Sequence, residues 1–220
     1  MTTRKKNRVR VLLCGGGTGG HVYPALAVVE ALRATAGMDA PMLYVGGQDS
    51  VEEKLAGRWN IPFARVDSGQ LRGKSPLRVA GALAQTLRGL MQARRVMRSY
   101  RPDVVFSTGG YASVPALIAA RRAGRPILIY LPDIEPGLTI KLLSRLADRI
   151  AVSFDIVTGY FSPDRVLVTG YPVRAALYAG DRVAARQRLG LRGDRPVLLA
   201  FGGSQGARSI NQAVVQNLER

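Results

Sequence analysis

Short apolar runs that end in glycines and continue into helical patterns recur along this chain. The glycine clusters lie at residues 15–20, 109–110 and 202–206. A strand that ends in glycines before a helix exposes backbone N–H groups at the helix N-terminus, where the helix dipole also favours negative charge. Glycine lets a ligand approach closely because it has no side chain. The pattern predicts an α/β fold with turns suited to phosphate.

The alternation of apolar runs and helical patterns extends over most of the chain. We expect strands at 8–14, 42–45, 63–66, 104–107, 127–130, 149–152 and 166–168, and helices at 23–34, 51–59, 114–123 and 138–146. Residues 76–100 are expected to form one long helix or a pair of helices. Such alternation is typical of a parallel sheet covered by helices on both faces. The fold class predicted is therefore α/β, with a Rossmann-like, doubly wound parallel sheet.

The pattern loosens after the last of these strands, which indicates a domain boundary. We expect an N-terminal domain at 1–174, a linker at 175–195, and the first βα unit of a second Rossmann-like domain at 196–220, with its strand at 197–201. A lone βα unit cannot form a doubly wound sheet by itself, so the second domain is expected to be truncated.

Charge and composition narrow the class of partner. The net charge of +17, from 32 Lys and Arg against 15 Asp and Glu, predicts an anionic partner. Nucleic acid is disfavoured as a partner because aromatic residues are only 6% of the chain and do not interleave with the basic ones.

The single cysteine, Cys14, excludes a disulfide framework and suggests a reducing compartment. No apolar run has the length of a signal-peptide core or a membrane span, which predicts a cytoplasmic protein, at most lying on a membrane.

The segment 71–101 combines basic and apolar residues without any acidic one. It carries Arg72, Lys74, Arg78, Arg88, Arg94, Arg95, Arg98 and Arg101 beside an apolar stripe of Leu77, Val79, Leu83, Leu87, Leu90 and Met91. A basic amphipathic segment suits an anionic membrane surface. The alternative is that the stripe belongs to the core and the arginines form a solvated face.

Two candidate site residues lie in or directly after the first glycine cluster. His21 is the only histidine and falls where a helix is expected to begin. Its imidazole could take a proton, bind a phosphate, or serve as a polar helix-start residue. Thr18 either contacts phosphate or caps the helix. The cluster also satisfies the dinucleotide fingerprint, but the strand at 42–45 has no acidic residue at its end, which argues against a nicotinamide enzyme.

Several motifs are more specific than these generic features. Residues 15–27 (GGGTGGHVYPALA) resemble the first glycine loop of the MurG family, and residues 101–105 leading into 109–115 resemble its second loop. The segments 71–74, 137–139, 170–174 and 202–207 follow in the family's order. The resemblance covers essentially the whole chain.

The resemblance implies an inverting glycosyltransferase of the GT-B type, a peripheral protein at the cytoplasmic face of the cell membrane. It implies transfer of N-acetylglucosamine from UDP-N-acetylglucosamine to the muramoyl 4-hydroxyl of lipid I, which gives lipid II for peptidoglycan. His21 would be the base or a ligand of the acceptor diphosphate. Diphosphate of the acceptor would lie against Thr18, Gly19, Gly20, Gly109, Gly110 and Tyr111. Donor contacts would come from Asp133, Arg174 and Ser204.

The chain departs from the family at two points. Asp133 stands where the family has a donor-contacting asparagine, and Asp133 or Glu135 is an alternative carboxylate base. Most of the donor domain is missing, so we expect no sugar transfer by this chain alone. The alternative function is a non-catalytic, membrane-associated acceptor-binding subunit that recruits a separate donor-binding chain. The sequence shows no metal-ligand cluster and no cofactor site, and magnesium is expected only as a companion of the diphosphates.

Overall fold

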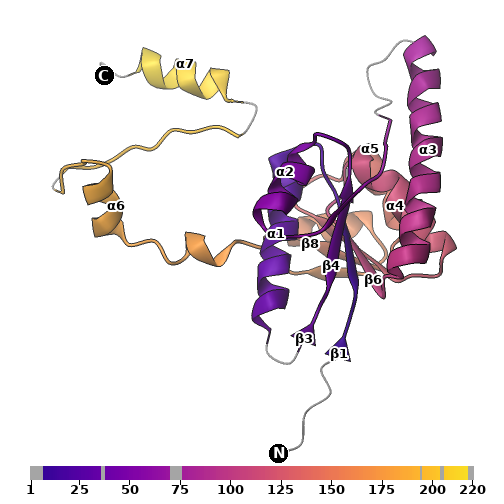
Figure 1. The fold of residues 1–220 in the computed structure, drawn as a ribbon. Helices are drawn as coiled ribbons and strands as arrows, with labels where there is room; N and C mark the ends of the chain where they lie inside the picture. The colour runs from indigo at the N-terminus through magenta and orange to yellow at the C-terminus, as the bar shows by residue number, and fades with distance from the viewer. Residues whose placement is uncertain (1–6, 36–37, 70–75, 194, 204–205, 218–220) are drawn as a thin grey trace, which may run out of the picture. The chain divides into compact units, whose positions relative to one another are not determined.

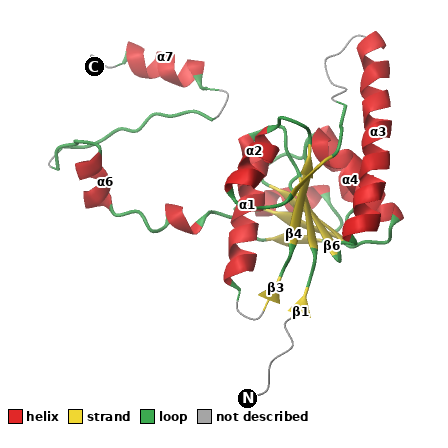
Figure 2. Cartoon of the chain, in the orientation of Figure 1, coloured by secondary structure: helices red, strands yellow, loops and turns green. Residues whose placement is uncertain are grey.

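The chain divides into two compact units, Met1–Arg174 and Ala175–Arg220. The computed structural model describes residues 7–35, 38–69, 76–193, 195–203 and 206–217. Figure 1 shows the ribbon of both units and Figure 2 its helices and strands.

The first unit is built on a parallel sheet whose order, within the described residues, is β5-β4-β2-β6-β7-β8-β9. Its register is continuous across the centre, where Leu13 faces Tyr44 on one side and Phe106 on the other. The seven strands are β2 (Val11–Cys14), β4 (Met42–Gly46), β5 (Phe63–Arg65), β6 (Val104–Ser107), β7 (Ile127–Leu131), β8 (Arg149–Val152) and β9 (Val166–Val168).

Helices cover both faces of this sheet. Successive residues of a strand point to opposite faces, so Val11 and Leu13 pack with α1 (Gly19–Ala34) and α2 (Val51–Arg58). Leu12 and Cys14 instead join the cluster that includes α3 (Pro76–Tyr100), α4 (Val114–Arg122) and α5 (Leu138–Leu143). Short 3-10 helices follow at η1 (Tyr111–Ser113), η2 (Ser144–Leu146) and η3 (Asp155–Tyr160). The predicted doubly wound α/β fold is confirmed.

The strand order reverses at the centre of the sheet. From β2 the chain steps outward to β4 and β5, and then α3 carries it back to β6 on the other side of β2. In sheets of this kind, ligands bind beyond the carboxyl ends of the strands at the point of reversal. The residues that follow β2 and β6 therefore define the candidate site.

Two predicted boundaries in the first unit differ from the structure. The strand predicted at 8–14 is divided, because β1 (Asn7–Arg8) pairs with β3 (Met38–Asp39) in a separate small sheet. Between β1 and β2, the Arg10 backbone N–H donates to the Asp103 carboxylate at 2.8 Å. The first helix begins at Gly19 rather than at residue 23. Glycine has a low helix propensity, which is why the sequence suggested the later start.

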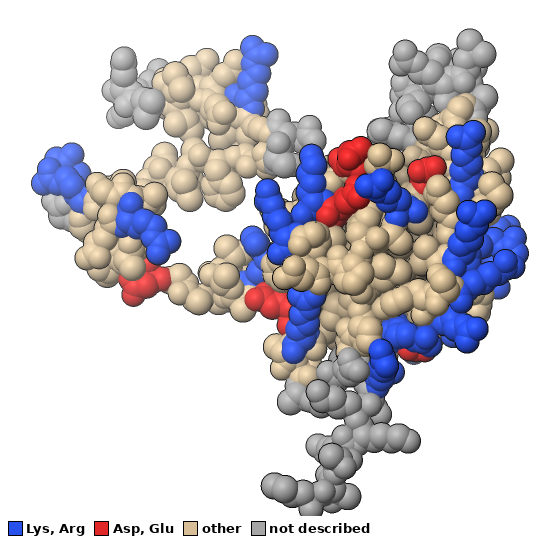
Figure 3. All heavy atoms as spheres, in the orientation of Figure 1, with Lys and Arg blue, Asp and Glu red and all other residues tan. Residues whose placement is uncertain are grey.

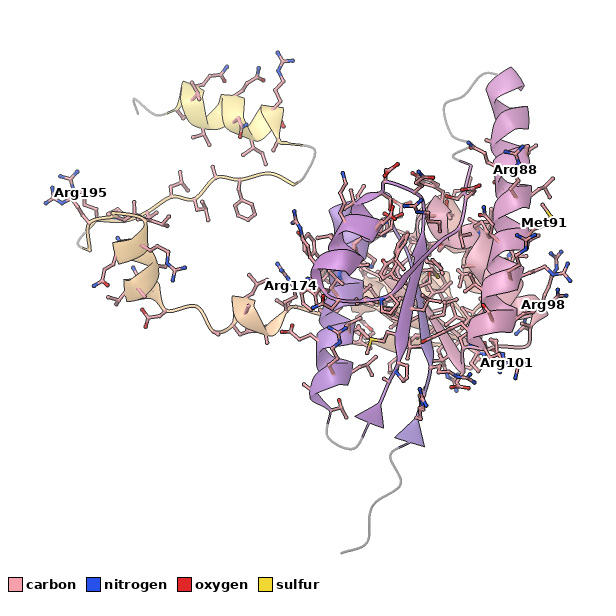
Figure 4. All side chains as sticks on the ribbon, in the orientation of Figure 1. Arg88, Met91, Arg98, Arg101, Arg174 and Arg195 are labelled. Atoms are coloured by element: carbon pink, nitrogen blue, oxygen red, sulfur yellow. The ribbon has the colours of Figure 1, made fainter. Side chains whose placement is uncertain are left out.

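One face of α3 turns apolar side chains outward. Leu83, Leu87 and Met91 are 50%, 63% and 57% exposed, whereas Ala82, Ala93 and Met97 are buried. Figure 4 shows Arg88, Met91 and Arg98 along the outer side of this helix, and Figure 3 shows Lys and Arg gathered there. This part of the predicted stripe is therefore not core. The side chains of residues 71–80, including Leu77, Val79 and Arg78, lie outside what is described.

Among the described residues, no helix is long and apolar enough to span a membrane.

The second unit contains η4 (Ala175–Leu177), α6 (Arg182–Arg188) and α7 (Arg208–Gln216). The segment 175–195 was predicted as a linker, but α6 forms there, and its N-cap Asp181 accepts the Ala184 N–H at 2.7 Å. Residues 197–201 do not form the predicted strand. A strand needs a neighbour for its backbone hydrogen bonds, and the described residues of this unit supply none. Leu198 and Phe201 are accordingly 85% and 73% exposed.

Candidate functional site

Two glycine loops interlock at the point where the strand order reverses. The first glycine loop (residues 15–20) follows β2, and the second glycine loop (residues 108–111) follows β6. The Thr108 N–H donates to the Cys14 carbonyl at 3.0 Å. A Cβ atom on Gly110, whose φ is +81°, would lie 2.4 Å from the Gly16 carbonyl oxygen. On the other loop, a Cβ atom on Gly15 would lie 2.1 Å from the Thr108 Oγ1 atom. Each loop therefore needs glycine where it contacts the other loop, because a Cβ atom there would prevent the close approach.

The N-terminus of α1 offers hydrogen-bond donors to an anion. Thr18 is its N-cap residue in an extended conformation, and the Thr18 hydroxyl makes no capping hydrogen bond. No acidic residue lies in the first turn of α1. The first N–H groups of a helix, here those of Gly19 and Gly20, have no acceptor within the helix. Together with the helix dipole, they make this end of α1 suited to a phosphate.

The His21 ring is held by a backbone carbonyl. Its Nδ1 atom lies 2.8 Å from the carbonyl oxygen of Thr108 in the second glycine loop. A carbonyl oxygen only accepts hydrogen bonds, so Nδ1 carries the proton in this contact. In the neutral imidazole, the lone pair then lies on Nε2. The hydrogen bond thus orients His21 as a proton acceptor through Nε2.

The second glycine loop also contains an unsatisfied polar group. The Thr108 side chain is fully buried, and within the described structure its Oγ1 atom has no hydrogen-bond partner. Ser113 differs, because its hydroxyl donates to the Gly110 carbonyl at 2.7 Å. Unsatisfied buried polar atoms are uncommon and are found at functional sites.

Glu52 is a site residue that the sequence did not reveal. It is only 2% exposed, and its carboxylate oxygens accept the N–H groups of Gly17 at 3.3 Å and Gly47 at 3.4 Å. Because this carboxylate occupies the Gly17 N–H, we expect an anion to bind at the α1 N-terminus and not at Gly17. Ser50 is the N-cap residue of α2 and accepts the Glu53 N–H at 3.1 Å. Within that cap, Glu52 resembled an ordinary first-turn carboxylate at the surface.

Arg174 lies beside the first turns of α1. Its guanidinium is 4.7 Å from the centroid of the Tyr23 ring, a cation–π contact. Tyr23 follows His21 by two residues, so the contact places a cation from the segment after β9 near the start of α1, the helix in which the first glycine loop ends. Figure 4 labels Arg174 at this position.

The segment after β7 carries Asp133, which is exposed. The Tyr130 hydroxyl lies 2.6 Å from Ser153 Oγ, and its ring meets that of Tyr171 edge-on. Burial raises the pKa of Tyr130 to about 12; the Ser153 hydrogen bond opposes the shift, while Tyr171 and Asp133 add to it. The phenol therefore stays protonated at neutral pH. Glu135 is also exposed, and Ser204 lies outside the described residues.

The structure therefore gathers several of the predicted residues and leaves others apart. The second glycine loop, with Gly109, Gly110 and Tyr111, adjoins the first glycine loop, with Thr18, Gly19 and Gly20. It also contacts His21 in the first turn of α1, and Arg174 reaches α1 through Tyr23. Asp133 follows β7, the strand next to β6. Its negative charge contributes to the raised pKa of both Tyr130 and Tyr171.

Glycine loops of this kind at the carboxyl edge of a doubly wound sheet are typical of Rossmann-like domains, and their backbone N–H groups are suited to a phosphate. Comparison with known families makes the assignment specific. Residues 11–152 match the glycosyltransferase family 28 N-terminal domain, and the chain belongs to this family. The resemblance found in the glycine loops is thereby confirmed.

Two curated relatives carry the same descriptive name. The chain is 38% identical over 213 residues to the UDP-N-acetylglucosamine--N-acetylmuramyl-(pentapeptide) pyrophosphoryl-undecaprenol N-acetylglucosamine transferase of Desulforamulus reducens. It is 43% identical over 209 residues to the protein of the same name from Desulforudis audaxviator. These matches cover 96% and 94% of this chain but 57% and 56% of the relatives. The chain thus spans little more than half their length.

Solved structures with a similar fold are also known. MurG of Acinetobacter baumannii superimposes with a TM-score of 0.62 at 30% identity, over 76% of this chain and 46% of that one. UDP-GlcNAc 2-epimerase of Neisseria meningitidis superimposes with a TM-score of 0.58 at 15% identity, over 96% of this chain and 62% of that one. The second similarity concerns the fold alone.

Proposed function

We propose that the chain is the acceptor-binding part of an enzyme that transfers N-acetylglucosamine from UDP-N-acetylglucosamine to lipid I. The observation that carries this proposal is the His21 ring, oriented by Thr108 with Nε2 as proton acceptor next to the α1 N-terminus. A diphosphate at that N-terminus would bring the attached sugar close to a base. The names of the curated relatives, which contain both the donor and the acceptor, support the choice of substrates.

In the proposed reaction the muramoyl 4-hydroxyl oxygen attacks the anomeric carbon of the donor sugar. The hydroxyl proton passes to Nε2 of His21 as the new carbon–oxygen bond forms. The bond between the anomeric carbon and the phosphate oxygen breaks, and its electron pair leaves with UDP. Attack opposite the leaving group inverts the anomeric centre. Arg174, beside Tyr23, provides positive charge for the departing diphosphate.

We also propose that the protein lies on an anionic membrane surface through the outer face of α3. Leu83, Leu87 and Met91 are exposed there, and arginines flank them. This arrangement suits insertion of apolar side chains at the level of the lipid headgroups, with arginines at the phosphates. The acceptor named for the relatives carries an undecaprenyl chain, which is a membrane lipid.

A non-catalytic acceptor-binding subunit is the second candidate. It is favoured by the family match, which concerns an N-terminal domain at residues 11–152. Such a subunit would bind lipid I in the same way and would depend on another chain for the donor.

The test compares binding with turnover. The first assay measures the affinity of the chain for a short-chain lipid I analogue. The second measures transfer of labelled N-acetylglucosamine to that analogue, by this chain alone and with a separately purified donor-binding domain. His21→Asn is the matched variant, because its amide N–H can still donate to the Thr108 carbonyl but provides no base. We expect near-normal binding and at least a hundredfold loss of turnover.

The outcomes separate the two candidates. Turnover that depends on His21 supports the enzyme, whether or not the added domain is required. Binding without turnover under every condition supports the acceptor-binding subunit. Failure to bind the analogue at all contradicts both.

A further inference from the structure

A polar cavity of about 360 Å³ lies next to the glycine loops. Its walls come from separate parts of the fold. Gln48, Ser50 and Glu52 belong to the turn after β4 and the start of α2, Asp67 follows β5, and Gln85 projects from α3. Tyr111 of the second glycine loop completes the wall. This volume lies within the range of small-ligand sites.

The described lining of this cavity carries negative charge, opposite in sign to the charge of the chain. Two carboxylates, Glu52 and Asp67, line it, and among the lining residues that the structure describes there is no Lys or Arg. The whole chain has a net charge of +17. Carboxylates repel phosphate and accept hydrogen bonds from N–H and O–H groups. The cavity therefore suits a neutral or amine-bearing group that is rich in hydrogen-bond donors.

The two carboxylates are held in place before any ligand binds. Glu52 accepts the N–H groups of Gly17 and Gly47, and a carboxylate still has lone pairs for further donors. The Asp67 carboxylate accepts Nε2 of Gln92 at 3.2 Å, while the Asp67 backbone N–H donates to Oε1 of Gln92 at 2.7 Å. Fixed polar groups of this kind reduce the entropy lost on binding.

The cavity adjoins the proposed phosphate site. Gly17 and Tyr111 line it and also belong to the two glycine loops. The Tyr111 ring lies directly over Gly17, 3.2 Å from where a Cβ atom would be. A ligand with its diphosphate at the α1 N-terminus can therefore extend its phosphate-free part past Tyr111 into the cavity.

We propose that this cavity is the subsite for the amide-bearing part of the acceptor, an inference that rests on the proposed function. In the acceptor named for the relatives, both the N-acetylmuramyl group and the pentapeptide carry amides. Amide N–H groups donate to Glu52 and Asp67, and amide carbonyls accept from the side chains of Gln48 and Gln85. The cavity selects the acceptor by these groups, while the glycine loops bind its diphosphate.

The test uses NMR of the full chain with probes that separate the two sites. Muramoyl-pentapeptide, without diphosphate or lipid, is expected to shift the side-chain amide signals of Gln48 and Gln85. Geranyl diphosphate, without sugar or peptide, is expected to shift Gly19 and Gly20 and to leave the cavity signals in place. N-acetylmuramic acid and the free pentapeptide, titrated alone, show which half of the acceptor occupies the cavity.

Variants then test the contacts. Gln85→Leu removes one hydrogen-bonding group from an exposed position of α3 and is expected to weaken muramoyl-pentapeptide binding about fivefold. Asp67→Asn keeps a hydrogen-bond acceptor for Gln92 and removes the negative charge. It should therefore weaken the binding of an amine-bearing peptide more than the binding of the same peptide with its amine acetylated. Gln187→Leu, at an exposed position of α6, is the control and should change neither affinity.

Two results would overturn the inference. If geranyl diphosphate shifts Gly19 and Gly20 but muramoyl-pentapeptide leaves the cavity signals unchanged, the cavity is not an acceptor subsite and the proposed function stands. If neither probe binds, the proposed function fails together with the subsite.

Discussion

Replacement of Gly110 by alanine tests the interlocked loops directly. Gly110 has φ +81° and ψ 160°, a conformation that is essentially restricted to glycine. Other residues held there lose about 1–3 kcal/mol. The new Cβ atom would also lie 2.4 Å from the Gly16 carbonyl oxygen, whereas ordinary contacts begin at 3.4 Å. The first glycine loop must therefore move by the difference, 1.0 Å.

Strain and displacement together are expected to lower the free energy of unfolding by about 3 kcal/mol. For a unit of this size, that corresponds to a fall in Tm of roughly 6–12 °C. The assay is thermal unfolding followed by circular dichroism. A displaced first glycine loop should also weaken geranyl diphosphate binding at least tenfold, because the proposed phosphate contacts depend on the positions of Gly19 and Gly20.

Two glycines serve as matched controls. Gly124 has φ +63°, and nothing lies within 4 Å of its Cβ position, so alanine there introduces backbone strain of about 1–2 kcal/mol without a clash. Gly57 lies inside α2 and also has open space, so Gly57→Ala should stabilise the protein by about 0.5–1 kcal/mol. If Gly110→Ala matches Gly124→Ala in both stability and ligand binding, the two loops are not interlocked as described.

Two further predictions concern the core and the surface. Burial raises the pKa of Cys14 from 9.0 to about 12, with an opposing hydrogen bond from Ser107. Above pH 9 the unfolded chain therefore loses a proton that the folded chain keeps, and the free energy of unfolding should fall between pH 9 and 12. Urea titrations should show a shallower fall in Cys14→Ala, and equal slopes would contradict the shift. On α3, the double change Leu87→Ser with Met91→Ser should reduce sedimentation with phosphatidylglycerol vesicles at least tenfold. The exposed control Leu167→Ser should have no effect, and equal losses in both would refute a specific membrane face.

Much of the fold follows from local patterns in the sequence. Four-residue apolar runs such as residues 104–107 have few alternatives to a buried strand when glycines follow them. The adjacency of the two glycine loops also follows from topology, because the carboxyl ends of neighbouring parallel strands share one edge. The sequence motif therefore predicts Gly110 as a site residue, although it does not reveal that Gly110 contacts Gly16.

The features that escaped prediction depend on tertiary contacts. Glu52 has the sequence context of a surface carboxylate, and only the fold places it beneath Gly16 and Gly46. The cavity beside it is formed by segments that are distant in sequence. The strand predicted at 197–201 has the right composition, but strand formation requires a neighbouring strand, and composition alone supplies no partner.

The crossover through α3 determines when the site can form during folding. His21 and Thr108 are 87 residues apart, and they meet only after β6 has joined β2. Closing a flexible loop of that length costs about 4 kcal/mol more than joining adjacent residues, so contacts of this kind are expected to form late. A chain leaving the ribosome can pair β2 with β4 long before β6 has emerged. Diphosphate binding would therefore be absent from such early intermediates, and its appearance would report that the crossover is complete.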